Sequence, residues 1–176
     1  SEQIKEICVK QQEHRIEVVA DKECDMRRQD AKETGKKAEK RKISPKEIMS
    51  LAAALDERSH RFRLTGGVHS AALAKDGEIL LMREDVGRHN AVEKLLGACV
   101  REQIDTADKT IVFSGRVAAE ILEKAAVIGV PTLIAVSAPT SRAVELAEEK
   151  GILLVGFARG ESFNVYTFPE RLAEVI

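Results

Sequence analysis

The chain is short of aromatic residues: among its 176 residues it has no tryptophan, one tyrosine and five phenylalanines, although 44% are hydrophobic. Its core must therefore be aliphatic, and its length fits one compact domain with a small appendage. The formal net charge is only −1, so no strong positive field attracts nucleic acid. No apolar run reaches the ~20 residues of a membrane-spanning helix, and no signal peptide opens the chain. We therefore expect neither nucleic acid nor a membrane as a partner.

Cysteine is scarce as well. The three cysteines, Cys8, Cys24 and Cys99, are odd in number and show neither paired nor metal-ligand spacing. This pattern is typical of a reducing compartment, so a cytoplasmic location is expected. Cys99 falls on the apolar face of a predicted helix and Cys8 in an alternating strand, which makes both inert. Cys24 lies in a polar stretch where Arg27 and Arg28 favour the thiolate, so a reactive thiol is one interpretation of it.

The composition divides the chain into three segments. In residues 1–20, apolar residues alternate with polar ones and predict two strands with a turn at residues 10–13. From Asp21 to Lys42 no Ile, Val, Leu or Phe occurs, so residues 21–43 are expected to form a charged mobile loop, or a solvated helix, that carries Cys24. Residues 44–176 hold the apolar periodicity of a folded α/β domain.

The third segment predicts a mixed sheet between two helical layers. Ser44-Pro45-Lys46-Glu47 has the N-cap, first-position proline and capping-box glutamate of a helix that runs to about Arg58. Asp76-Gly77 is the tight turn of a β-hairpin. The predicted strands are 68–74, 78–82, 110–113, 132–136, 152–157 and 163–168, and the further helices are 87–103, 117–128, 142–150 and 169–176. This alternation indicates a three-layer α/β/α fold.

The stretch from Arg83 to Ala91 places polar side chains where a strand hands over to a helix. The first N–H groups of a helix have no internal partner and carry the positive end of its dipole, so such a junction binds anions. Arg88 adds a guanidinium suited to phosphate, His89 a group that titrates near neutral pH, and Asn90 an amide. The alternative is an ordinary surface helix with Arg88 and His89 in water.

Two further strand-to-helix turns carry similar groups, Ser114-Gly115-Arg116 and Ser137 to Ser141. In open α/β sheets, ligands bind beyond the carboxyl ends of the strands, so all three turns are expected at one edge. Arg159-Gly160 adds a third guanidinium there. We expect a nucleotide-like, phosphate-bearing ligand, although Arg116 and Arg159 could instead form surface ion pairs.

Thr65-Gly66-Gly67 precedes His69 and is another candidate for ligand contact. Its two glycines let a backbone approach a ligand closely. His69 lies in an otherwise apolar strand, where the alternative is a hydrogen-bonded core histidine.

Five ordered motifs resemble the FdhD family, the formate dehydrogenase accessory sulfurtransferases. They are Thr65-Gly66-Gly67-Val68-His69-Ser70-Ala71-Ala72-Leu73, Arg83 to Ala91, Ser114-Gly115-Arg116, Val136-Ser137-Ala138-Pro139-Thr140-Ser141, and Val155-Gly156-Phe157-Ala158-Arg159-Gly160 with Phe163-Asn164-Val165-Tyr166-Thr167. The similarity is collinear from about Ser44 to Thr167.

The resemblance implies a cytidine-deaminase-like fold and a cytosolic homodimer. It implies that sulfur is taken as a persulfide from a cysteine desulfurase and passed to the molybdenum or tungsten (Mo/W) bis(pterin guanine dinucleotide) cofactor, which then enters apo-formate dehydrogenase. The family pocket holds the guanine nucleotide part, which GDP-like ligands mimic. The residues assigned to it by position are Thr65, Gly66, Gly67, His69, Arg88, His89, Asn90, Ser114, Gly115, Arg116, Ser137, Phe157, Arg159 and Gly160.

The chain departs from the family pattern in two ways. The family carries sulfur on a C-x-x-C loop, whereas the matching region here has only Cys24, which we assign as the persulfide carrier. Family members usually have a further domain upstream of residue 1, so a shortened or divergent member is expected. The alternatives are a non-catalytic module that binds the cofactor or the apo-dehydrogenase, and an unrelated nucleotide-binding regulator.

Zinc deamination is not expected. Zinc deaminases place H-x-E and P-C-x-x-C at successive helix starts. The corresponding positions here are His89-Asn90-Ala91 and Ser114-Gly115-Arg116-Val117, with no carboxylate and no cysteine pair.

Overall fold

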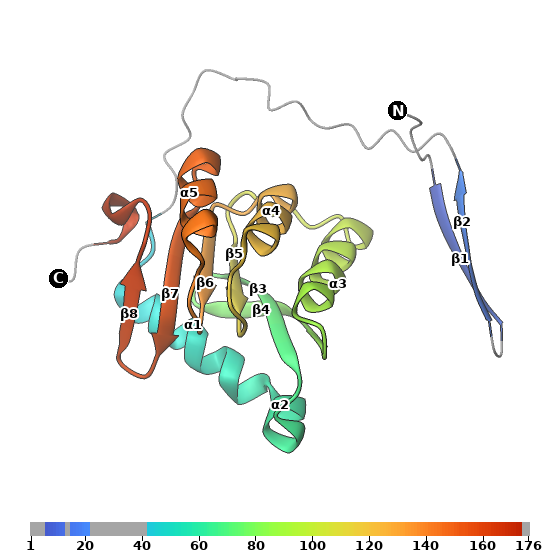
Figure 1. The fold of residues 1–176 in the computed structure, drawn as a ribbon, viewed down its shortest axis with the longest axis horizontal. Coiled ribbons are helices and arrows are strands. Elements are labelled where there is room, and N and C mark those ends of the chain that lie inside the picture. Colours follow the sequence, from blue (N-terminus) through green and yellow to red (C-terminus); the bar gives the residue numbers. More distant parts are fainter. Residues whose placement is uncertain (1–5, 13–14, 22–41, 174–176) are drawn as a thin grey trace. The chain divides into compact units, whose positions relative to one another are not determined.

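The computed structural model describes residues 6–12, 15–21 and 42–173 (Figure 1). The chain divides into two compact units, Ser1–Ala38 and Glu39–Ile176. In the first unit, β1 (Glu6–Gln12) pairs antiparallel with β2 (Arg15–Asp21), as the alternation predicts. The expected turn at residues 10–13 is wrong, because β1 continues to Gln12 and pairs there with Arg15. Cys24 and the rest of residues 22–41 lie outside the described residues.

The second unit is built on a six-stranded mixed sheet in the order β4-β3-β5-β6-β7-β8. Its strands are β3 (His69–Lys75), β4 (Glu78–Asp85), β5 (Thr110–Phe113), β6 (Thr132–Ala135), β7 (Leu153–Arg159) and β8 (Ser162–Val165). Strands β5, β6 and β7 run parallel, while β3 is antiparallel to both of its neighbours and β8 is antiparallel to β7.

Helices cover both faces of this sheet and confirm the expected three-layer α/β/α architecture (Figure 1). They are α1 (Pro45–Arg58), α2 (His60–Thr65), α3 (Arg88–Arg101), α4 (Ala119–Ile128) and α5 (Ser141–Lys150), followed by the 3-10 helix η1 (Pro169–Arg171). Neighbouring residues of a strand point to opposite faces. Ile111 of β5 accordingly packs in the core under α3, α4 and α5, and Val112 in the core under α1.

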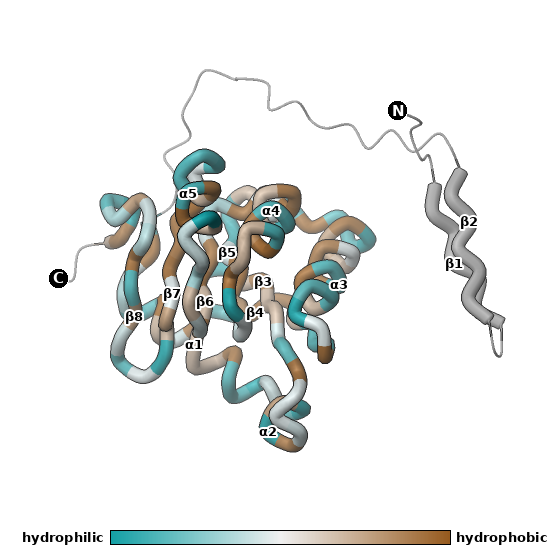
Figure 2. Tube along the Cα trace, viewed as in Figure 1, coloured by the Kyte–Doolittle hydropathy of each residue, from teal (hydrophilic) through white to brown (hydrophobic). Residues whose placement is uncertain are grey.

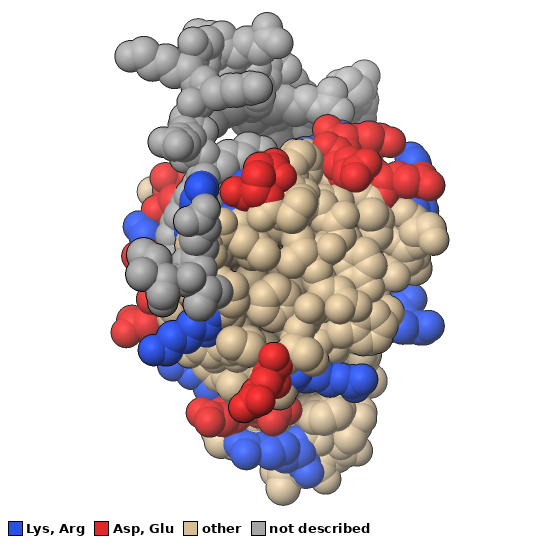
Figure 3. All heavy atoms as spheres, turned by 90° about the vertical axis from the view of Figure 1, so that its left-hand side faces the viewer, with Lys and Arg blue, Asp and Glu red and all other residues tan. Residues whose placement is uncertain are grey.

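The apolar segments concentrate in the central strands and on the inner sides of the helices (Figure 2). Charged side chains lie mainly around the margin of the face that β8 borders, and uncharged side chains fill its middle (Figure 3). None of the helices formed by the described residues combines the length and the apolar character needed to cross a membrane.

Local signals in the sequence explain several element boundaries. Ser44 Oγ accepts a hydrogen bond from the Glu47 N–H (3.1 Å), so the predicted N-cap of α1 is confirmed. The hairpin turn is formed by Asp76 (φ 53°) and Gly77 (φ 81°), as expected for Asp-Gly.

Several elements differ from those expected, and β8 ends at Val165 rather than at residue 168. Residues 60–65 form α2, which the sequence does not predict. Strand β4 continues past Met82 to Asp85, and α4 begins at Ala119 because Val117 donates its N–H to the Ala138 carbonyl. The expected helix 169–176 is wrong, since η1 ends at Arg171 and Leu172 bridges to Ile43.

Candidate functional site

The strand register gathers the predicted polar turns at one edge of the sheet. His69, the first residue of β3, pairs with Asp85, the last residue of β4. Phe113 at the end of β5 pairs with Ala71 and with Ala135 at the end of β6. The turns that follow β4, β5 and β6 therefore share an edge with the start of β3, as the strand-end rule predicts. We call this edge the rim.

The start of α3 is held by Asp85. Its Oδ1 accepts hydrogen bonds from the Gly87 N–H (2.8 Å) and from Asn90 Nδ2 (3.2 Å), and its Oδ2 lies 2.5 Å from Lys94 Nζ. These donors, Lys94 first, lower the pKa of Asp85 to about 2. Gly87 is the N-cap and offers no side chain, so the first N–H groups of α3 have no side-chain cap. The helix start thus remains available to an anion.

Arg88 and the two histidines form the centre of the rim. Arg88 Nε donates to His89 Nε2 at 3.4 Å. Burial lowers the pKa of His69, and the nearby Arg88 guanidinium lowers it further. His69 is therefore favoured in its neutral form, beside a fixed positive charge.

The turn after β5 packs tightly against His69. A Cβ atom at Gly115 would lie 2.7 Å from Phe113 Cζ and 3.2 Å from His69 Nδ1. Only a glycine leaves room for this approach of backbone to ring. Gly115 therefore sets the distance between the β5 turn and the β3 histidine.

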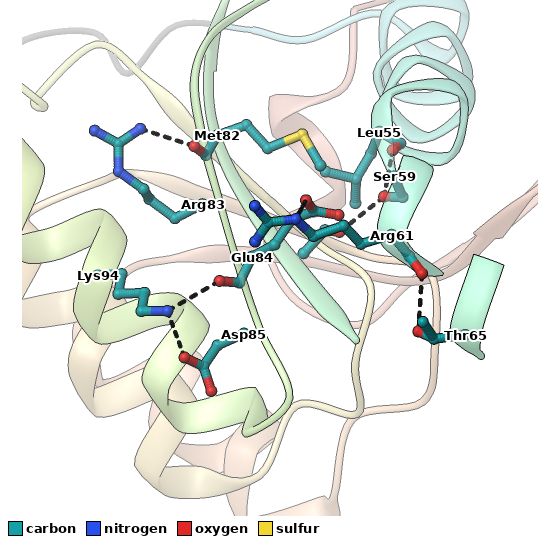
Figure 4. A network of polar contacts seen from close by, with 10 residues as sticks. Leu55, Ser59, Arg61, Thr65, Met82, Arg83, Glu84, Asp85 and Lys94 are labelled. Carbon is teal, nitrogen blue, oxygen red and sulfur yellow. Dashed lines mark hydrogen bonds and ion pairs between the residues drawn. The ribbon is translucent and has the colours of Figure 1, made fainter. Parts of the chain in front are cut away.

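A chain of three serines, of which Ser59 and Ser70 are buried, fixes the strands behind the rim. The Ser70 N–H donates to Ser114 Oγ (2.9 Å), and the Ser114 N–H donates to the Ser70 carbonyl (3.0 Å). Ser70 Oγ lies 2.8 Å from Ser59 Oγ, which donates to the Leu55 carbonyl (Figure 4). The network links α1 to β3 and β5, and it makes Ser114 a positioned residue rather than a free helix cap.

The other two helix starts differ from each other. The N-cap of α4, Ala118, has no side-chain hydrogen bond, whereas Thr140 caps α5 by accepting from the Ala143 N–H. Ser137 uses its carbonyl to accept from the Phe157 N–H at 3.2 Å. Phe157 has φ 53°, a left-handed conformation that is uncommon for a bulky residue, and lies at a register shift of β7. Among the three starts, those of α3 and α4 are the ones without side-chain caps.

Two adjoining cavities connect the rim from β3 to β7. A cavity of about 130 Å³ is bordered by His69, Ser114 and Phe62, and one of about 420 Å³ by Arg159 and Gly160. Asp56 and Val136 line both of them, so the cavities meet. The structure therefore brings His69 and Ser114 into one trough with Arg159 and Gly160.

The remaining predicted residues lie at the outer part of the rim. Thr65 Oγ1 bonds within its own segment, to the Arg61 carbonyl and the Gly67 N–H. Gly66 ends α2 with φ 68°, and a Cβ atom there would meet nothing within 4 Å. Arg116 and Arg159 are exposed, and no described residue forms an ion pair with either of them or with Arg88. The surface ion pairs considered as an alternative thus have no partner in the described part of the chain.

Sequence reasoning missed several residues of the site. Ser59 and Ser70 organise the rim through contacts with residues distant in sequence. Asp85 does so through nearby Gly87, Asn90 and Lys94, and Asp56 lines both cavities. Ser70 within the apolar run of β3 was the one sequence signal for the serine network, because a buried hydroxyl needs a hydrogen-bond partner.

The described residues offer no cluster of three or more His, Cys, Asp or Glu side chains that could hold a metal ion. Cys99 is buried, and burial raises the pKa of its thiol, with the Glu102 carboxylate adding to the effect. A thiol of this kind is a poor nucleophile. Cys99 thus has the inert character that its helix position predicts.

Comparisons with known proteins identify relatives along nearly the whole chain. The FdhD/NarQ family matches residues 2–173. A sulfur carrier protein FdhD from Geobacillus kaustophilus is 52% identical over 130 residues, which cover 74% of this chain and 49% of the relative. One of the same name from Bacillus subtilis is 51% identical over 133 residues, covering 76% and 51%. The chain spans about half the length of these relatives.

A solved structure supports the fold. The crystal structure described as a formate dehydrogenase accessory protein from Desulfotalea psychrophila has a TM-score of 0.70 with 32% sequence identity, covering 76% of this chain and 60% of that one. The similarity agrees with the mixed α/β architecture of the second unit.

Proposed function

Because the chain belongs to the FdhD/NarQ family, we propose that it serves formate dehydrogenase maturation by carrying sulfur to the Mo/W bis(pterin guanine dinucleotide) cofactor. The observation that carries this proposal is the family match over residues 2–173, together with relatives named sulfur carrier protein FdhD that share 51% to 52% sequence identity with the aligned part of the chain. The partners in this proposal are a cysteine desulfurase, the apo-dehydrogenase and a second copy of the chain, all in the cytoplasm.

The rim suits the nucleotide end of such a client. Two helix starts without side-chain caps supply N–H donors, and Arg88, Arg116 and Arg159 supply guanidiniums that no described carboxylate neutralises. Pyrophosphate is the group that both kinds of donor favour. The trough between His69 and Gly160, which Arg159 lines, gives the rest of the ligand a place at the same edge of the sheet.

Cys24 is the proposed sulfur carrier. Its thiolate would attack the terminal sulfur of the desulfurase persulfide, forming the new S–S bond while the donor cysteine leaves as a thiolate. This exchange needs no outside oxidant, since one S–S bond replaces another. Arg27 and Arg28 nearby favour the thiolate form.

A non-catalytic binding module is the second candidate function. The observation that favours it is that the segment has one cysteine, while Cys99 is buried with a raised thiol pKa. Residues 21–43 thus hold no second cysteine beside Cys24 that could resolve a persulfide in the manner of a C-x-x-C pair. Such a module would hold the cofactor, or chaperone the apo-dehydrogenase, through the same rim.

GDP binding tests the proposed use of the rim. Arg88→Ala and Arg116→Ala each remove one charged hydrogen-bond donor, which should weaken binding by about 1.5 to 3 kcal/mol, roughly 10- to 150-fold in Kd. Arg142→Ala is the matched control, because Arg142 at the start of α5 already pairs with Glu145 (2.9 Å) and Glu149 (3.5 Å). Equal GDP affinity in all three variants would contradict the assignment of the rim.

Cys24→Ser separates the two candidate functions. For a sulfur carrier, the substitution abolishes transfer of sulfur while GDP binding persists. For a binding module, the same substitution changes neither activity. Sulfur transfer is measured with sulfur-labelled cysteine and a desulfurase as the sulfur source. GDP binding is measured on the same protein without the desulfurase.

A further inference from the structure

A large cavity lies over the outer edge of β4, apart from the trough of the rim. Its volume is about 790 Å³, and helices α1 and α2 border it on one side and α3 on the other. We call it the β4 groove; its lining residues are Arg58, Arg61, Met82, Arg83, Glu84, Lys94, Gly97, Ala98 and Arg101. Five of these side chains are cationic and one is acidic. The lining of the groove is thus strongly cationic.

Three of the cations cover the open edge of β4. Arg58 Nη1 donates to the Ile79 carbonyl (3.0 Å), Arg83 Nη1 to the Met82 carbonyl (2.8 Å), and Lys94 Nζ to the Glu84 carbonyl (3.2 Å). Figure 4 shows the last two of these contacts. An edge strand whose carbonyls are already bonded gives an added strand few partners. A peptide in extended form therefore finds little backbone to pair with here.

The carboxylates around the groove do not balance its cations. Glu102 forms ion pairs with both Arg83 (3.6 Å) and Arg101 (3.2 Å), and Asp85 pairs with Lys94. Glu84 Oε2 lies 3.8 Å from Arg61 Nε, which leaves the two terminal nitrogens of Arg61 without a partner among the described residues (Figure 4). Five cations thus face three carboxylates.

The floor of the groove is open at Gly97 of α3. A Cβ atom at this position would meet nothing within 4 Å, so the fold does not require a glycine there. A glycine inside a helix costs about 1 kcal/mol relative to alanine. The missing side chain at Gly97 leaves room above the helix backbone between Lys94 and Arg101, where a ligand can approach closely.

We propose that the β4 groove is a second anion site, which binds a phosphate-bearing small molecule between Arg61 and Arg101. The inference is independent of the proposed function, since no residue that lines the groove also lines the two cavities of the trough. Guanidiniums bind phosphate and carboxylate alike in forked geometry. A small phosphate-bearing molecule suits the groove better than an acidic peptide, because the bonded carbonyls of β4 leave a peptide backbone few partners.

Inorganic pyrophosphate and two-dimensional amide NMR test this site directly, at an ionic strength of about 0.15 M, where weak surface attraction is screened. We expect saturable shifts of the Gly97 and Ala98 amide resonances. The double variant Arg61→Gln with Arg101→Gln should weaken the apparent affinity at these amides at least ~10-fold. Arg88→Ala and Arg142→Gln should leave the response of these amides unchanged.

Two more variants distinguish a specific pyrophosphate site from non-specific attraction of anions to the positive surface. Glu84→Gln removes the lining carboxylate and should tighten binding. Gly97→Gln fills the floor without changing charge and should abolish the response. Thermal unfolding checks that each variant is folded.

Several outcomes would overturn the proposal. Shifts that grow linearly without saturation, or that decrease equally in Arg142→Gln, would indicate diffuse attraction. Saturation by a glutamate decapeptide but not by pyrophosphate would assign the groove to acidic polypeptide. Broadening at Gly97 that depends on protein concentration alone would assign it to contact between copies, and no response at all would leave no site.

Discussion

A Cβ atom at Gly115 would lie 3.2 Å from His69 Nδ1, so the turn after β5 packs directly against the imidazole at the start of β3. The same atom would overlap the ring of Phe113, which is fully buried and cannot move aside. The geometry of the rim therefore depends on the absence of a side chain at this position.

Gly115→Ala should destabilise the fold by about 1 to 3 kcal/mol, the usual cost of overpacking a buried site. Gly67→Ala is the control, since its Cβ atom would meet only the Thr65 carbonyl at 3.9 Å. Urea unfolding of both variants measures the difference. A Gly115→Ala protein as stable as Gly67→Ala would contradict the close packing described.

The titration of His69 should respond to Arg88. Burial and the Arg88 charge both hold the pKa of His69 below its ordinary value of 6.5. In Arg88→Ala the pKa should rise toward 6.5 but remain below it, because burial persists. An anion bound at the rim should raise it in wild type. NMR titration of the His69 ring measures these shifts, and an unchanged His69 titration in Arg88→Ala would contradict the effect of the Arg88 charge.

The lowered pKa of His69 also sets the direction in which its contribution to folding stability changes with pH. His69 binds a proton more weakly in the folded protein than in the unfolded chain. Its protonation therefore favours unfolding, and its effect lowers stability as the pH falls below about 6.5. His69→Gln should remove this part of the pH dependence, whereas an unchanged dependence would contradict the lowered pKa.

Asp85 should make the fold sensitive to acid. Its pKa of about 2 in the folded protein lies below the ordinary value of 3.8, so the unfolded chain binds the proton first as the pH falls. The stability it contributes is present above about pH 4 and is lost as the pH falls through about 2. In Asp85→Asn, the unfolding midpoint should depend less on pH between about 4 and 2. An unchanged acid dependence in Asp85→Asn would contradict the lowered pKa of Asp85.

Arg171 should be essential to the C-terminal segment. Its buried guanidinium donates to the Pro131 carbonyl (2.9 Å) and to Thr132 Oγ1 (3.1 Å). Arg171→Met would leave these acceptors unpaired and should cost roughly 1 to 3 kcal/mol in unfolding free energy. Arg159→Met, at an exposed arginine, should stay within about 0.5 kcal/mol of wild type. Equal stabilities would show that the Arg171 contacts contribute nothing.

The elements predicted correctly are those with signals inside the element itself. Ser44 with Pro45 starts α1, and Asp76-Gly77 turns the hairpin, because each signal is a backbone preference of the residues concerned. Gly129 and Gly151 end α4 and α5 in the left-handed conformation for the same reason.

The elements missed depend on distant partners or are too short to predict. The segment after Pro169 has a helical pattern, yet Arg171 turns inward to the Pro131 carbonyl, and Ala173 donates its N–H to the Ile43 carbonyl. The six residues of α2 are too few for helical periodicity to be visible. Strand β4 continues through Arg83-Glu84-Asp85 because an edge strand can carry polar residues.

The sequence predicts where the rim lies in the fold, but it does not predict the side-chain contacts within the rim. The strand-end rule places Arg88, Ser114 and Ser137 together from the order of elements alone. The contacts behind them join Ser70 to Ser114, 44 positions apart, and Ser59 to Ser70, 11 positions apart, and no local pattern specifies such pairs. The β4 groove was missed for the same reason, since its cations come from four elements.

The role of Cys24 as a sulfur carrier is best tested by intact-protein mass spectrometry after incubation with a cysteine desulfurase and cysteine, followed by peptide mapping. We expect an adduct of about 32 Da, one sulfur atom, on Cys24, and its loss in Cys24→Ser but not in Cys99→Ser. No adduct, or one found on Cys8 or Cys99 alone, would contradict the carrier role and leave the chain as a cofactor-binding module.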